Sequence, residues 1–92
     1  MSLVVEYRIA QGRTETGRRT VVIDGGAVVD AHDGAAEAPD VVVRLTPALA
    51  EQVRARTLDV GAGFMRGEIK TDGDFGALLH ALPVLHRDPG LG

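Results

Sequence analysis

The residues of this sequence that could do chemistry gather in one short stretch, EIKTDGDFG, which holds a lysine and two aspartates next to glycines. Asp72 and Asp74 could act as a carboxylate pair in acid–base chemistry or bind calcium. The stretch lacks the twelve-residue ligand series of a calcium-binding loop, and Asp74 stands where a side chain caps a helix. We therefore predict a turn at Gly73 and a helix cap at Asp74 instead of a chemical site.

Other residues that catalysis or metal binding would need are few and scattered. The chain has no cysteine, and Ser2 is its only serine. His32, His80 and His86 do not form the H-x-x-x-H or H-E-x-x-H pairs of zinc sites, and no glycine pattern matches a phosphate-binding loop. We predict a protein that is not an enzyme and needs no cofactor or metal, with His80 as a partly exposed helical residue.

The charge of the chain argues against nucleic acid as a partner. The chain has ten Lys and Arg residues against thirteen Asp and Glu residues, and only three of its residues are aromatic. Arg13, Arg18 and Arg19 form a small basic cluster interrupted by Glu15, which indicates a solvated loop face more than an anion site. No apolar run approaches the roughly 20 residues that span a bilayer, so we expect no stable membrane insertion. The absence of cysteine fits a cytoplasmic location.

The elements that must position these residues follow from periodicity. In LVVEYRIA, apolar side chains alternate with Glu6 and Arg8, as in a half-buried strand, and Gly25-Gly26 supply the tight turn of a hairpin. Polar loops are expected at 11–17 and 32–39. Five strands are predicted, at residues 3–10, 18–24, 27–31, 40–45 and 68–71.

Three helical pieces are predicted between and after these strands. Thr46 and Pro47 start a helix over 47–56, and Asp59 caps a shorter one through Met65 that Gly61 and Gly63 weaken. The last helix begins at Asp74 and ends near Pro83. This order predicts one α+β domain over residues 1–92: a five-stranded, antiparallel-rich sheet with about three short helices on one face.

The stretches DVVVRLT and FMRGEIKTDGDFGALL resemble the SCP2-type (sterol carrier protein 2) lipid-binding domain family, from about Tyr7 to Leu85. The resemblance implies an apolar tunnel between sheet and helices that binds a sterol, fatty acid or acyl chain without reaction. Two features depart from the family: the helices that usually precede the first strand are absent, and glycines weaken the helix before Phe64. The matching residues are Phe64, Met65, Gly67, Ile69, Lys70, Gly73 and Asp74.

Nine apolar residues are the predicted lining of this ligand groove. They would equally form an ordinary core or, in the alternative function, a dimer or partner interface without lipid. An empty pocket of about 300 Å³ would cost roughly 7 kcal/mol, too much for a small chain, so we expect the groove to be filled by ligand, covered by a second subunit or collapsed. We predict a symmetric homodimer that buries the uncovered face of the sheet. The nine residues are Leu49, Val53, Leu58, Phe64, Met65, Ile69, Phe75, Leu78 and Leu82.

Overall fold

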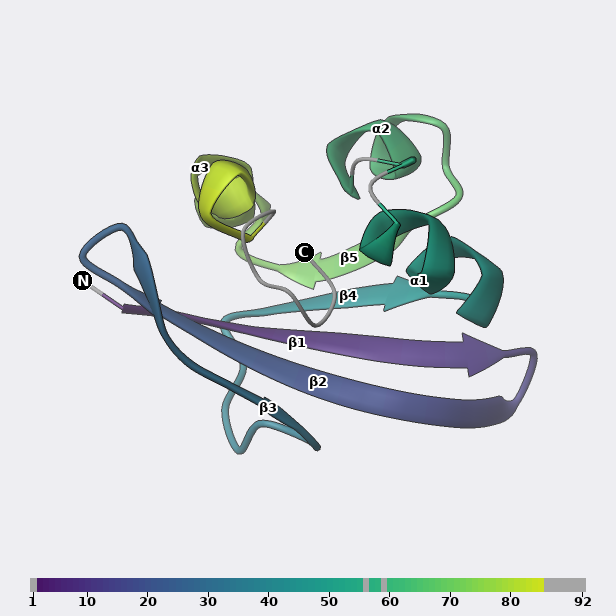
Figure 1. Ribbon diagram of the computed structural model, residues 1–92, viewed down its shortest axis with the longest axis horizontal. Coiled ribbons are helices and arrows are strands. Elements are labelled where there is room, and N and C mark those ends of the chain that lie inside the picture. Colours follow the sequence, from purple (N-terminus) through teal and green to yellow (C-terminus); the bar gives the residue numbers. More distant parts are fainter. Residues whose placement is uncertain (1, 56, 59, 86–92) are drawn as a thin grey trace.

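A computed structural model describes residues 2–55, 57, 58 and 60–85 of the chain. A five-stranded sheet forms one layer, and three helices lie together on one of its faces (Figure 1). The predicted α+β fold is confirmed, while the predicted cap Asp59 and His86 lie outside the described residues. In chain order the elements are β1 (Ser2–Gln11), β2 (Thr14–Asp24), β3 (Ala27–Asp33), β4 (Val41–Leu45), α1 (Pro47–Arg54), α2 (Val60–Met65), β5 (Lys70–Gly73) and α3 (Phe75–Leu85).

The sheet has the strand order β3-β2-β1-β4-β5 and is mixed. Its central strand β1 pairs antiparallel with β2 and parallel with β4, and the β2–β3 and β4–β5 pairs are antiparallel. The parallel pair requires the chain to cross between β3 and β4. The loop of residues 34–40 makes this crossing on the face of the sheet that the helices leave uncovered (Figure 1).

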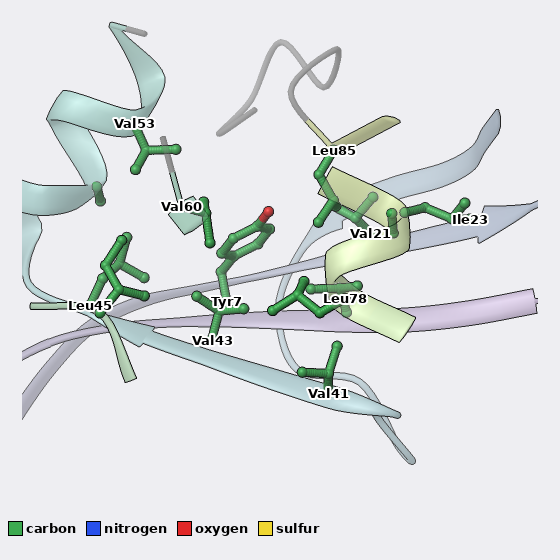
Figure 2. Close-up of a cluster of buried hydrophobic side chains, with 14 of the residues drawn as sticks. Tyr7, Val21, Ile23, Val41, Val43, Leu45, Val53, Val60, Leu78 and Leu85 are labelled. Carbon is green, nitrogen blue, oxygen red and sulfur yellow. The ribbon is translucent and has the colours of Figure 1, made fainter. Parts of the chain in front are cut away.

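The core lies between the sheet and the helices. Val5 and Tyr7 of β1 point toward the helices and are almost fully buried, and Val21 and Val41 flank Val5 on the neighbouring strands. Figure 2 shows Tyr7 upright among aliphatic side chains, with Leu78 of α3 packed over Val41. Burial of apolar surface, worth about 25 cal/mol per Å², holds the helices to the sheet.

Two of the three predicted helix caps, Thr46 and Asp74, are confirmed. The Thr46 hydroxyl accepts a hydrogen bond from the amide of Leu49 at 3.2 Å, and Pro47 occupies the first helical position of α1. At α3, the Asp74 carboxylate accepts a hydrogen bond from the amide of Ala77 at 3.0 Å. Each side chain satisfies an amide that has no partner within the first turn of its helix.

The short helix α2 forms in spite of the glycines that weaken it. A β-carbon at Gly63 would collide with the side chain of Ile69, which is fully buried beneath it. Glycine therefore lets the backbone of α2 approach the core closely. This contact compensates for a helix propensity about 1 kcal/mol poorer than that of alanine.

Several boundaries differ from the prediction; β3, for example, runs to Asp33 instead of to residue 31. The loop expected at 11–17 is only a tight turn at Gly12 and Arg13, because both flanking strands continue pairing up to it, with one irregularity in register at Ile9. The strand β5 begins at Lys70 instead of at residue 68. Pro83 lies inside α3 instead of ending it. Because proline has no amide hydrogen, one helical hydrogen bond is missing at this position, and the helix ends two residues later, at Leu85.

Candidate functional site

The nine predicted lining residues differ widely in burial. Val53, Leu58, Ile69 and Leu78 are buried, at most 5% exposed, and belong to the core cluster between sheet and helices. Met65, in contrast, is 84% exposed at the end of α2. The remaining four are partly buried: Leu49, Phe64, Phe75 and Leu82. The predicted lining is thus divided between buried, partly buried and exposed positions.

An aromatic pair lies between α2 and α3. The rings of Phe64 and Phe75 stack with their centroids 4.2 Å apart and their planes 28° from parallel. A pair of this kind contributes about 0.5–1.5 kcal/mol beyond the area that it buries. The sequence motif that carries the family resemblance therefore joins two helices through its aromatic residues.

A surface groove of about 240 Å³ lies beside the core, between α3 and the ends of β1 and β2 nearest the N-terminus. Its wall on α3 contains Ala77 and Ala81, one helical turn apart, whose small side chains leave the space open. Leu3 and Ile23 form its floor on the sheet. The full lining is Ser2, Leu3, Ile23, Gly26, Ala77, His80, Ala81 and Val84. This lining is almost wholly apolar, and none of it belongs to the nine predicted residues.

The residues first considered for chemistry have structural roles. Asp72 forms an ion pair with Arg44 at 2.6 Å, whereas Asp74 caps α3, so the two carboxylates do not act on one centre. His80 is exposed on α3, as predicted. Among the described histidine, aspartate and glutamate residues, no three lie close enough together to hold a metal ion.

The predicted basic cluster is dispersed by the strand geometry. Arg18 and Arg19 are neighbours in β2 and therefore point to opposite faces of the sheet. Arg18 pairs with Glu15 at 2.8 Å, and Arg19 approaches Asp33 at 3.5 Å on β3. Arg13 lies apart from both in the turn between β1 and β2.

A buried carboxylate on the helix-free face was not predicted. The side chain of Glu6 is 1% exposed because the loop 34–40 covers it. It accepts hydrogen bonds from Arg8 and from the amide of Ala36, the latter at 2.8 Å, and Arg18 lies 3.9 Å away. Burial alone would raise the pKa of Glu6, but these hydrogen bonds and the two positive charges outweigh it and hold the pKa below its usual value.

Within the described part of the chain, none of the helices combines the length and the apolar character that crossing a membrane requires. The longest of them, α3, has 11 residues, about half of what a bilayer span needs. Its apolar side chains Leu78, Ala81 and Leu85 are buried against the rest of the protein instead.

Known proteins share this arrangement of sheet and helices. Palmitated SCP2L2 of Aedes aegypti superposes with a TM-score of 0.71 at 21% identity, over 91% of this chain and 72% of that one. The protein TT1886 of Thermus thermophilus, described as possibly a sterol carrier protein, gives a TM-score of 0.66 at 22% identity, over 95% of this chain and 67% of its own. The sec-alkylsulfatase Pisa1 of Pseudomonas sp. gives 0.65 at 21% identity, over 90% of this chain and 13% of that protein.

At these identities the solved structures establish the fold. No curated protein matches the sequence significantly. The family model described as the SCP-2 sterol transfer family matches residues 3–85, which include every described strand and helix except the first residue of β1. The chain therefore belongs to the SCP-2 sterol transfer family.

Proposed function

We propose that this protein binds an apolar ligand, a fatty acid, acyl chain or sterol, without chemical reaction. The observation that carries the proposal is the apolar groove between α3 and the sheet. Membership in a sterol transfer family and the palmitate named for the similar SCP2L2 structure support the same ligand class. Binding by burial alone needs no nucleophile and no metal ligand.

The size of the groove limits how much of a ligand it holds. Its volume of about 240 Å³ is below the 300 to 1,000 Å³ usual for small-molecule pockets, so a long acyl chain would be only partly enclosed. Each buried methylene contributes about 0.8 kcal/mol, or roughly a fourfold gain in affinity. The affinity for fatty acids should therefore rise with chain length until the groove is full, and then level off.

The nine predicted residues enter this proposal as a deeper part of the site. Leu78 and Leu82 lie on the helix that forms one wall of the groove. A ligand longer than the groove would reach them if α3 shifts and the stacked rings of Phe64 and Phe75 part. In such a site Met65, exposed and flexible, would fold over the bound chain.

Filling the groove from within tests the proposal. We expect Ala77→Leu to weaken binding of a fluorescent C16 fatty acid at least fivefold while leaving the midpoint of thermal unfolding unchanged or higher, because leucine occupies the ligand's space. Ala48→Leu, on the exposed side of α1, is the matched control and should bind as the unmodified protein does. Equal affinity of Ala77→Leu and the unmodified protein would exclude this groove, and absence of binding to any fatty acid would refute the function.

A homodimer or partner interface is the second candidate. It is favoured by the exposure of Met65 at 84% and Leu79 at 49%, two large apolar side chains on the helix side. The helix-free face is a poorer dimer surface because it carries charged residues such as Arg8, Arg44 and Asp72. Light scattering at micromolar concentration decides: a dimer that Leu79→Ser dissociates supports the interface, and a monomer counts against it.

A further inference from the structure

A second hollow lies at the opposite end of the sheet from the apolar groove. It has a volume of about 430 Å³ and is formed where β1 and β4 end, beside the β1–β2 turn and the approach to β5. In Figure 1 this is the end of the sheet where β1 turns into β2, below α1. Its lining is Arg8, Ala10, Gly12, Arg13, Glu15, Arg44, Leu45, Thr46, Glu68 and Lys70. We call it the basic groove, since four cationic side chains meet two carboxylates there.

The two carboxylates of the basic groove are engaged elsewhere. Glu15 pairs with Arg18 at 2.8 Å, and Glu68 lies 3.7 Å from Arg66. Both of these arginines stand outside the lining, and their positive charges offset those of the two carboxylates. The positive charge within the groove is therefore not cancelled by its own acids.

The four cations of the basic groove differ in their described partners. Arg8 is hydrogen-bonded to Glu6, and Arg44 is paired with Asp72. Arg13 and Lys70, in contrast, have no ion-pair partner among the residues that the structure describes. Each can therefore turn its charged group toward a ligand without giving up an existing contact.

The start of α1 adds a further positive element. Thr46 lines the groove and is also the N-cap of this eight-residue helix. The amide end of a helix carries about half a positive charge, which stabilises an anion placed near it. Guanidinium groups, an ammonium group and a helix N-terminus together match the oxygens of a phosphate group.

We propose that the basic groove binds a phosphate group, with Arg13 and Lys70 as its principal contacts. Its volume exceeds that of one phosphate, so an attached organic group would also fit. The site does not depend on the proposed lipid function: Leu3 and Ala10, which line the two grooves, lie roughly 23 Å apart along β1 at about 3.3 Å per residue. Loss of one activity should leave the other unchanged.

Titration with inorganic pyrophosphate, followed by amide chemical shifts, tests the site. We expect saturable shifts at Gly12, Arg13, Thr46 and Lys70, with a dissociation constant of about 1 mM or lower that weakens as salt is added. Arg13→Ala and Lys70→Ala should each weaken binding about fivefold to tenfold. Arg54→Ala, which removes the same charge from α1 outside the groove, is the matched control and should not. Glu68→Gln should strengthen binding.

Shifts spread over cationic residues throughout the surface, or equal effects of Arg54→Ala and Lys70→Ala, would overturn the proposal. The source of the phosphate group is distinguished by cosedimentation with vesicles of phosphatidylcholine, with and without one quarter phosphatidylglycerol. Pelleting with the anionic vesicles alone, lost in Arg13→Ala, identifies a lipid headgroup. Pyrophosphate binding without pelleting identifies a soluble phosphate compound. If pyrophosphate does not bind and the protein does not pellet with either kind of vesicle, the site is refuted.

Discussion

Replacing Gly73 with alanine is expected to lower the free energy of unfolding by about 3 kcal/mol, a large share of the stability of a small domain. Gly73 has φ +103°, a backbone conformation that residues with a side chain rarely adopt. A β-carbon there would also collide with the carbonyl oxygen of Asp40 and lie 3.0 Å from the Cα of Val41. Because both neighbours are backbone atoms, relief requires β5 to move away from β4.

Urea unfolding at pH 7 measures this loss, with Gly25→Ala as the control. Gly25 has φ +61° but open space around its Cα, so alanine there should cost only about 1 kcal/mol. Equal losses in the two variants would show that the collision is relieved cheaply. Gly73→Ala should also weaken fatty-acid binding, since the next residue, Asp74, is tied to Asp40 by a backbone hydrogen bond of 3.0 Å and starts the helix that forms the groove wall.

Glu6→Gln is expected to cost about 2 kcal/mol at pH 7. The carboxylate accepts hydrogen bonds from Arg8 and from the amide of Ala36, and glutamine offers only one acceptor oxygen and no charge in the same space. The contact of the loop 34–40 with Glu6 is then weakened, while its hydrogen bonds between Asp40 and Val4 remain. Glu37→Gln, on an exposed side chain in the same loop, is the control and should leave the unfolding free energy nearly unchanged.

The pH dependence of stability tests whether the charge of Glu6 stabilises the folded protein. Since the pKa of Glu6 is lowered in the folded state, its contribution is complete above the unfolded pKa of about 4.3 and is lost as the pH falls through the lower folded pKa. The unmodified protein should therefore be more stable than Glu6→Gln at neutral pH and lose this advantage in acid. A constant difference between the two unfolding curves at every pH would contradict the role of the charge.

The local structure could be predicted largely from the sequence. Alternation in β1, the capping residues Thr46 and Asp74, and the hairpin glycines each act over a few neighbouring residues. Helix α2 shows where such reasoning stops. Propensity counts the cost of Gly63, but the compensating contact with Ile69 exists only once the chain has folded.

The long-range features could not be predicted from local patterns. Alternation assigns Glu6 to the solvent side of β1, and nothing in the composition of residues 34–40 shows that this loop crosses beneath the sheet and buries it. The parallel pairing of β1 with β4 depends on the same crossing. The rule for proline predicts a helix end at Pro83 because it does not consider how close the helix already is to its last turn.

The apolar groove was missed for a physical reason. Apolar periodicity identifies side chains that become buried when the chain folds. It does not distinguish a filled core from a ligand pocket, and Leu78 would be buried in either. The groove instead results from side-chain volume that is missing at Ala77 and Ala81. Two alanines one turn apart on a leucine-rich helix are the only signal, and whether they face another element is a property of the tertiary structure.

The crossing between β3 and β4 also sets an order for folding during synthesis. The hairpins of β1, β2 and β3 join neighbouring segments, whereas the link from Val4 to Asp40 spans 36 positions. Until β4 has left the ribosome and docked, the side of β1 that it will cover presents unpaired amides and carbonyls, which can add a strand from another molecule. The central strand of the finished sheet is thus an open edge in the nascent chain, and the moment of greatest aggregation risk falls before the last helix exists.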